Sequence, residues 1–113
     1  MDIQMEIQKK LKQLDVSVKE LRNTGSRYAE SYTNYRIAVA KELVMLRDDG
    51  VPVTIAFDVA RGKPEIAKLK FNEIRDEAIY LANKESIMAI KLEIKILENQ
   101  LQREYSIGSG DNI

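Results

Sequence analysis

The sequence of 113 residues contains no cysteine, no histidine and no tryptophan. Without cysteine the chain can form neither disulfides nor thiolate sites, which fits a reducing cytosol. Without histidine it lacks the commonest general base and the commonest ligand for transition metals. It also has no glycine-rich phosphate loop and no nucleophile motif. These absences predict a non-enzymatic protein that uses no cofactor and binds no metal.

Long apolar runs and an excess of one charge are also lacking. No stretch approaches the roughly 20 apolar residues that a membrane span needs. The N-terminal "MDIQMEIQKK" has no continuous apolar segment of the kind found in signal peptides. The 18 basic and 18 acidic residues cancel, so the whole chain shows no bias toward duplex DNA. We therefore expect a soluble, cytoplasmic protein that does not enter a membrane.

Proline and glycine are few, and several of them lie in one segment. Both prolines and two of the five glycines fall in "RDDGVPVTIAFDVARGKPE", which runs from Arg47 to Glu65. The rest of the chain is rich in Glu, Lys, Gln, Leu and Ile, a composition typical of long amphipathic helices. The pattern predicts an all-α fold, in which two long helices form an antiparallel hairpin around a connecting bend.

The expected boundaries follow from helix start and stop signals. The first helix covers 2–48, with Asp2 as N-cap and Gly50 as the C-terminal stop. The bend, 49–63, holds a short helix over 55–61 that Thr54 caps and Gly62 closes. Pro64 suits the first turn of the last helix, which covers 64–105. We expect 1–105 to be one domain and 106–113 a flexible tail.

The apolar residues of the first helix follow a heptad rhythm. Steps of four and three residues connect Ile7, Leu11, Leu14, Val18, Leu21, Gly25, Tyr28, Tyr32, Tyr35 and Val39, and Leu46 follows seven residues later. Only Glu42 is polar where the rhythm expects an apolar residue. Such a pattern over five heptads predicts a coiled-coil seam.

Gly25 lies inside this rhythm without changing its phase. Because glycine within a helix costs about 1 kcal/mol relative to alanine, it weakens the helix locally. We expect one continuous helix, with a break near residues 23–26 as the alternative. In that alternative the first helix folds back and covers the second helix within one monomer.

The second long helix is apolar on more than one side. Its first half carries the stripe Ala67, Phe71, Ile74, Ala78 and Leu81, and its second half adds Met88, Leu92 and Ile96 beside a second stripe. One antiparallel partner covers only one narrow seam. We therefore predict a homo-oligomer, most simply a dimer that forms a helical bundle. Its predicted interface is the second stripe, which consists of Ile87, Ile90, Ile94, Leu97 and Leu101.

The three tyrosines of the first helix permit two interpretations. Tyr28, Tyr32 and Tyr35 have the spacing of one face, so their rings could stack bases or a peptide. The interpretation we favour is that they fill the space beside Gly25.

The bend combines apolar side chains with a local excess of positive charge. The candidate partner-binding residues are Val53, Ile55, Phe57, Arg61, Lys63, Lys68 and Lys70. A basic, partly apolar tip suits an acidic protein surface or a nucleic-acid backbone. The alternative is that Ile55, Phe57, Val59 and Ala60 close the end of the hairpin core while the cations are solvated.

Two segments carry a resemblance to a known group of proteins. The bend has the form "LRxDGVPVTxxxDxARG" at residues 46–62, and "LENQLQRE" stands at residues 97–104. Over residues 34–105 the chain resembles small uncharacterised proteins encoded in early regions of phages and prophages of Gram-positive bacteria, often near recombination or replication genes. The resemblance implies an accessory or host-modulating protein of the host cytoplasm and supplies no catalytic residue.

We therefore predict an oligomeric interaction protein whose bend binds a host or phage protein. The alternative is a nucleic-acid-binding accessory of phage recombination or replication that uses the basic tip.

Overall fold

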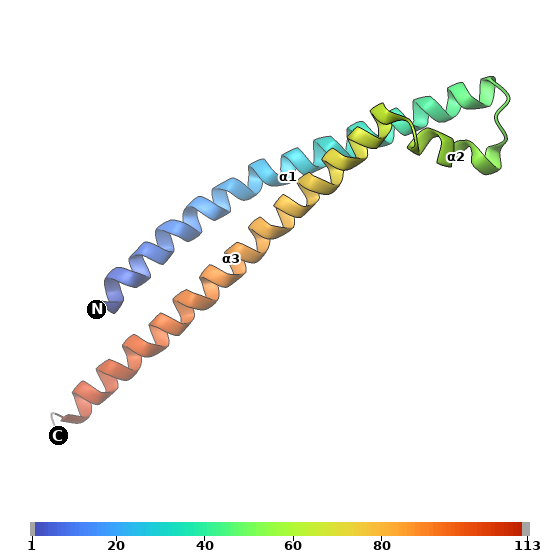
Figure 1. Cartoon of the computed structure of the whole chain (residues 1–113). Coiled ribbons are helices and arrows are strands. Elements are labelled where there is room, and N and C mark those ends of the chain that lie inside the picture. The colour runs from blue at the N-terminus through green and yellow to red at the C-terminus, as the bar shows by residue number, and fades with distance from the viewer. Residues whose placement is uncertain (1, 112–113) are drawn as a thin grey trace. The chain divides into compact units, whose positions relative to one another are not determined.

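The computed structural model describes residues 2–111. It contains three helices and no strand within those residues: α1 (Ile3–Asp48), α2 (Val53–Arg61) and α3 (Pro64–Asp111). The predicted all-α helical hairpin, with a short helix in its bend, is confirmed (Figure 1).

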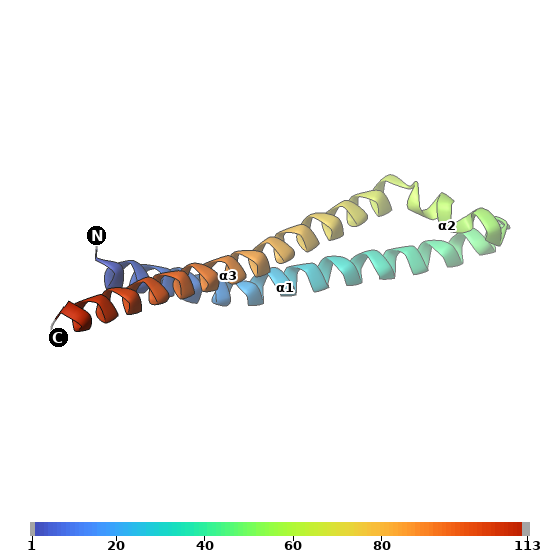
Figure 2. The ribbon, with the colours of Figure 1, turned by 90° about the horizontal axis from the view of Figure 1, so that it is seen from below.

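The chain divides into two compact units. Unit 1 contains residues 2–22 and 82–111, and unit 2 contains Asn23–Leu81. In each unit a segment of α1 lies antiparallel to a segment of α3 (Figure 2). In unit 1 the side-chain amide of Asn83 donates a hydrogen bond to the Ser17 carbonyl at 3.1 Å, and Lys10 forms an ion pair with Glu93.

Helix α1 begins and ends as the sequence predicts. The Asp2 carboxylate accepts hydrogen bonds from the backbone N–H groups of Gln4, at 3.0 Å, and Met5, at 3.4 Å. These bonds satisfy donors that have no partner within the first turn. Between these ends α1 is one continuous helix, so the alternative break near Gly25 does not occur.

Gly25 has a packing role in unit 2. A Cβ atom at this position would lie 3.3 Å from Cε1 of Tyr80. The Tyr80 ring also contacts that of Tyr28, with ring centroids 5.9 Å apart. The glycine therefore lets an aromatic ring of α3 approach the α1 backbone closely.

Helix α2 starts two residues earlier than expected, so the Thr54 cap is a wrong prediction. Pro52 occupies the N-cap position with φ −57° and ψ 140°, and it makes no side-chain cap. Its carbonyl accepts the N–H groups of Ile55 and Ala56. The fixed φ of proline sets the extended residue before the helix, so Val53 and Thr54 already lie in the first turn.

Helix α3 begins at Pro64, as expected, but continues past Tyr105 to Asp111. Most of the predicted tail, 106–113, is thus helical. Its last two residues, 112 and 113, lie outside the described residues.

Polar residues occupy several positions of the seam between α1 and α3. The predicted seam residues Leu11, Val18 and Tyr32 are exposed. The positions one residue before the first two of these, Lys10 and Ser17, instead contact α3. In unit 2, Ser31 takes the same role in place of Tyr32. The other apolar seam residues, which are Ile7, Leu14, Leu21, Tyr28, Tyr35, Val39 and Leu46, are buried or half-buried. The heptad rhythm therefore predicts most of the seam and misses the three levels at which a neighbouring polar residue takes the inner position.

Each unit has its own apolar core. In unit 2, Val39, Leu46, Ala60 and Ile66 form a buried cluster, against which Tyr35, Ala38, Leu43 and Val51 pack. In unit 1 the buried apolar residues are Ile3, Ile87, Ile90 and Ile94.

Candidate partner-binding groove at the bend

The turn between α1 and α2 is a Schellman motif. Gly50 has φ 81°, its N–H bonds to the Arg47 carbonyl, and the N–H of Val51 bonds to the Leu46 carbonyl. Val51 also packs against the buried cluster that contains Leu46. This pattern closes the last turn of α1 and directs the chain back toward it.

Helix α2 is amphipathic, and its apolar residues do not all face the core. Ala56 and Ala60 are buried, Ala60 completely. Val53, Ile55, Phe57 and Val59 are exposed, with Val53 retaining 77% of its accessible surface. The small alanines let α2 approach α1 closely, while the larger side chains remain available for other contacts.

A groove lies between the end of α1 and the beginning of α2. It has a volume of about 330 Å³ and is lined by Leu43, Val44, Arg47, Val51, Val53, Ala56 and Phe57. Arg47 is the only charged residue among them. An open apolar groove with one cation is suited to an apolar side chain of a partner and one nearby acceptor.

The predicted tip residues divide between this groove and contacts within the chain. Val53 and Phe57 line the groove. Ile55 and Lys68 are exposed, outside the groove lining. The Arg61 guanidinium lies over the Phe57 ring, 5.3 Å from its centre, but Arg61 does not line the groove.

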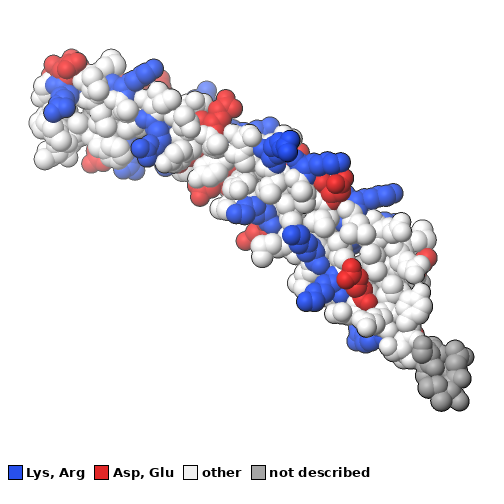
Figure 3. Space-filling view, turned by 180° about the vertical axis from the view of Figure 1, so that it is seen from behind, with Lys and Arg blue, Asp and Glu red and all other residues white. Residues whose placement is uncertain are grey.

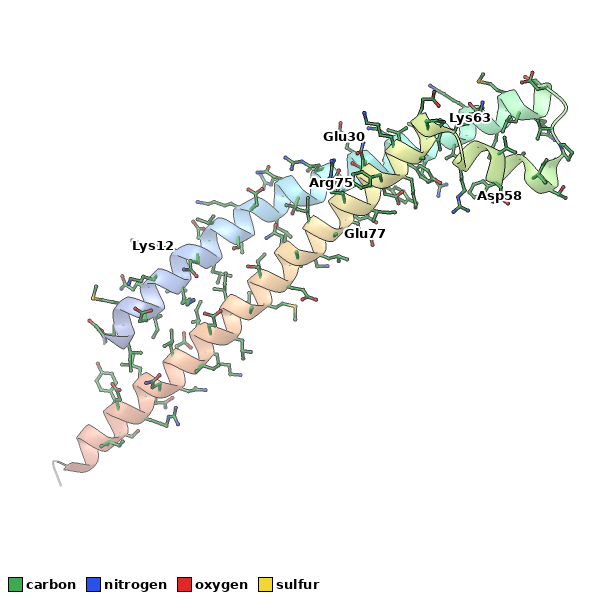
Figure 4. All side chains as sticks on the ribbon, in the orientation of Figure 1. Lys12, Glu30, Asp58, Lys63, Arg75 and Glu77 are labelled. Carbon is green, nitrogen blue, oxygen red and sulfur yellow. The ribbon has the colours of Figure 1, made fainter. Side chains whose placement is uncertain are left out.

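Two of the predicted basic residues are engaged inside unit 2. Lys63, at the junction of α2 and α3 (Figure 4), forms an ion pair with Glu42. The hydrogen bond to Glu42 raises the pKa of Lys63. Lys70 forms an ion pair with Glu73 at 3.0 Å, and its ammonium lies 4.8 Å from the centre of the Tyr35 ring. These contacts reduce the positive charge that the bend offers to a partner.

Charge is not gathered at the bend on the face that Figure 3 shows. Lys and Arg side chains are spread along that face, with acidic side chains between them. This distribution differs from the basic stripe expected of a surface that follows a nucleic-acid backbone.

The α1 side of the groove was missed by the sequence interpretation. Leu43 and Val44 belong to the apolar run "LVML" at residues 43–46. A run of four apolar residues is wider than one coiled-coil seam, and Val44 and Met45 are indeed exposed. The run was the available signal for a second apolar surface on α1.

The predicted oligomer interface needs a correction. Ile87, Ile90 and Ile94 are buried within the single chain, and Leu97 and Leu101 are half-buried. In unit 1 these residues follow the side of α3 that faces α1, so the hairpin itself covers them. Met88, Leu92 and Ile96, interspersed with them along α3, are exposed instead.

The tyrosines of α1 do not form one open platform. Tyr28 meets Tyr32 edge to face, with centroids 6.4 Å apart, and also contacts Tyr80. Tyr28 and Tyr35 are half-buried. Burial, and then the neighbouring Glu77, raise the pKa of Tyr28. The packing of Tyr28 beside Gly25 and Tyr80 fits the space-filling interpretation.

A buried carboxylate lies in the seam of unit 2. Asp76 is 2% exposed. It accepts a hydrogen bond from the Ser31 hydroxyl and one from Nε of Arg75 at 3.1 Å. These two bonds, that from Ser31 first, lower the pKa of Asp76 against the opposing effect of burial.

Neither a metal cluster nor a membrane span is found within residues 2–111. No three acidic side chains in this part of the chain are placed to hold an ion together. None of the described helices combines the length and the apolar character needed to cross a bilayer. Comparison with known protein families, with curated proteins and with solved structures finds no match.

Proposed function

We propose that this chain is a non-enzymatic helical hairpin that binds a partner protein through the groove between α1 and α2. The observation that supports the proposal is the lining of that groove. Six of its seven residues are apolar, and Val53 and Phe57 remain 77% and 47% exposed. Exposed apolar residues gathered around a groove mark binding surfaces more often than scattered ones do.

The groove favours a partner that inserts an apolar side chain. Anchor residues of protein interfaces are typically buried in such pockets and surrounded by weaker contacts. Arg47, at the α1 side, can bind a carboxylate or a carbonyl next to the anchor. The resemblance to phage-encoded proteins suggests a host or phage protein in the cytoplasm as the partner.

Nucleic acid is the less favoured partner. Lys63 and Lys70 are held by acidic residues of the same unit, and the formal charge of the chain is zero. Binding through phosphates would weaken steeply with added salt, whereas binding in an apolar groove would not.

The proposal is tested by affinity capture with two matched valine variants of α2. Val53→Ser removes an apolar side chain from the groove, and Val59→Ser removes an identical side chain from a part of α2 outside its lining. The immobilised wild-type protein, Val53→Ser and Val59→Ser are each exposed to the same host extract at low and at moderate salt.

We expect a protein that is captured by the wild type and by Val59→Ser but lost with Val53→Ser, and retained at moderate salt. Circular dichroism should show equal helicity in all three. Equal capture by both variants would contradict the proposed site. Capture of nucleic acid that disappears with added salt would support the alternative function instead.

A further inference from the structure

In unit 2, helix α1 has a second apolar stripe on the side that lies away from the buried cluster. Val39 and Leu46 are part of that cluster. Ile37 and Val44 each stand two residues before one of them, and two residues correspond to a rotation of about 200° around a helix. Ile37 and Val44 are accordingly 48% and 59% exposed. The stripe therefore lies on the side of α1 opposite to the cluster.

The exposed residues on this side have the spacing of a coiled-coil seam. The hydroxyl of Thr33 donates a hydrogen bond to the Ala29 carbonyl at 2.8 Å, which leaves its methyl group for apolar contact. Ala40 is small enough to let another helix come close. Steps of four and three residues connect five exposed positions, which we call the outer seam: Thr33, Ile37, Ala40, Val44 and Arg47. The outer seam is about 21 Å long and suits one further helix.

The outer seam ends in the groove at the bend. Val44 and Arg47 belong to both, since they line the groove together with Val53 and Phe57 of α2. A helix that lies along the outer seam can therefore place one apolar side chain in the groove. Because the groove serves as its anchor, the inference about this helix rests on the proposed function.

The charged residues along the outer seam are basic. Arg36 and Lys41 flank it, one on each side, and Arg47 is its last member. Within residues 2–111 none of these three cations forms an ion pair with a carboxylate. The Arg36 guanidinium lies 5.7 Å from the centre of the Tyr32 ring, a contact that leaves its charge without a counter-ion.

Acidic residues are scarce on this part of α1. Between Glu30 (Figure 4) and Asp48, which mark the two ends of the outer seam, Glu42 is the only one. The Glu42 side chain is only 13% exposed and forms an ion pair with Lys63. The outer seam therefore offers its cations to a partner without an exposed acid between them.

We propose that the outer seam binds an acidic amphipathic helix of a partner protein. Apolar residues of that helix pack on Ile37, Ala40 and Val44, and carboxylates beside them pair with Arg36 and Lys41. Residues that flank a seam set the choice of partner, because opposite charges attract across it and like charges repel. A further apolar side chain of the partner helix enters the groove.

A second copy of the chain does not supply the matching charges with its own outer seam. In a parallel pair of outer seams, Arg36 would lie beside Lys41 of the second copy. In an antiparallel pair centred on Ala40, the two Lys41 side chains would lie close together. Like charges at these positions oppose pairing. The partner is therefore a different protein, whose helix carries acidic flanking residues.

The proposal is tested with two synthetic helical peptides that differ only in charge. Both carry Leu at the two seam positions of each heptad, and the flanking positions are Glu in one peptide and Lys in the other. Each peptide is fluorescently labelled, and its anisotropy is measured as the protein is added. The matched protein variants are Lys41→Glu, beside the outer seam, and Lys68→Glu, whose lysine is also exposed but lies on α3.

We expect the wild type to bind the acidic peptide and not the basic one. Lys41→Glu should weaken that binding about tenfold, whereas Lys68→Glu should leave it unchanged. Circular dichroism should show equal helicity in the three proteins. Failure of the wild type to bind the acidic peptide, equal binding of both peptides, or equal effects of the two substitutions would each overturn the proposal.

Two further variants separate the outer seam from the groove. Ile37→Ser alters only the outer seam, and Val53→Ser alters only the groove. Both should weaken binding of the acidic peptide. If only Val53→Ser does so, the groove stands and the outer seam falls. If only Ile37→Ser does so, the outer seam stands and the groove falls.

Other occupants of the outer seam would give different results. A wild-type dimer that Ile37→Ser dissociates, measured by sedimentation, would assign the outer seam to a second copy. An oligonucleotide that competes with the acidic peptide and is released by added salt would assign it to nucleic acid. Either result would overturn the acidic helix as the partner.

Discussion

Asp76 shows how a single residue can decide which side of a helix faces inward. Its carboxylate is almost fully buried, and burying a charge costs free energy unless hydrogen bonds compensate it. Here Ser31 supplies one bond across the hairpin and Arg75 another from the same helix. The bond to Ser31 aligns α1 and α3 at this level, because a shift by one residue would place Tyr32 against the buried carboxylate.

Asp76 gives stability a pH dependence with a defined sign. Its pKa is lowered in the folded chain from the ordinary value of 3.8, so the unfolded chain takes up the proton first as the pH falls. Its contribution to the free energy of unfolding is therefore complete above pH 3.8 and is lost as the pH falls through the lower folded value. Asp76→Asn should make the acid-side loss of stability shallower, as measured by urea unfolding over a pH series.

A matched variant controls for the loss of one negative charge. Asp58, labelled in Figure 4, is an exposed carboxylate on α2. As the pH falls, the free energy of unfolding of Asp58→Asn should decrease more steeply than that of Asp76→Asn. If the two variants have the same pH profile as the wild type, the buried hydrogen bond of Asp76 does not stabilise the folded state.

At the scale of elements, the short connections determine where the groove lies. The left-handed Gly50 ends α1, Pro52 starts α2 immediately afterwards, and Pro64 starts α3. Because only two residues stand between Gly50 and α2, that helix is held against the end of α1. The completely buried Ala60 allows this close approach, and a larger residue there would overfill the site.

The two glycines of the bend should respond differently to alanine. Gly50 has φ 81°, and a side chain in that conformation costs about 1–2 kcal/mol. Gly62 has φ −80°, and an added Cβ there would meet its nearest atom at 3.5 Å, an ordinary contact. We expect Gly50→Ala to lower the free energy of unfolding by about 1–2 kcal/mol and Gly62→Ala to leave it unchanged or slightly higher. Urea unfolding measures both, and equal effects would contradict the assigned role of Gly50.

At the scale of the molecule, the sequence predicts the elements better than their contacts. The ends of α1, the start of α3 and the short helix follow from Asp2, Gly50, Pro64 and the turn residues, because caps and turns act over a few neighbouring positions. The residue of α1 that faces Asp76 does not follow, because Ser31 and Tyr32 are adjacent and only packing against α3 selects between them. The rule that seams are apolar selects Tyr32, but the structure places the hydroxyl of Ser31 on Asp76.

The groove residues could be predicted from the sequence only in part, because some of them take part in the groove only through tertiary packing. Val53 and Phe57 stand out as apolar residues in a short, polar-flanked segment. Leu43 and Val44 belong to a helix that already has a seam, and their second role depends on where α2 packs. Residues that act through tertiary contact are missed when each helix is interpreted alone.

The central claim is that, beside the apolar core of unit 2, the buried Asp76 and Ser31 set the facing sides of α1 and α3 and leave Tyr32 and Ile74 outside. Two double-cysteine variants test it directly: Ser31→Cys with Asp76→Cys, and Tyr32→Cys with Ile74→Cys. Under mild oxidation at low protein concentration, the disulfide formed within a single chain is measured by mass and electrophoretic mobility. The cysteines at positions 31 and 76 should form a disulfide. Those at positions 32 and 74 replace two exposed residues and should stay reduced. Closure of the second pair with the first left open would contradict the account.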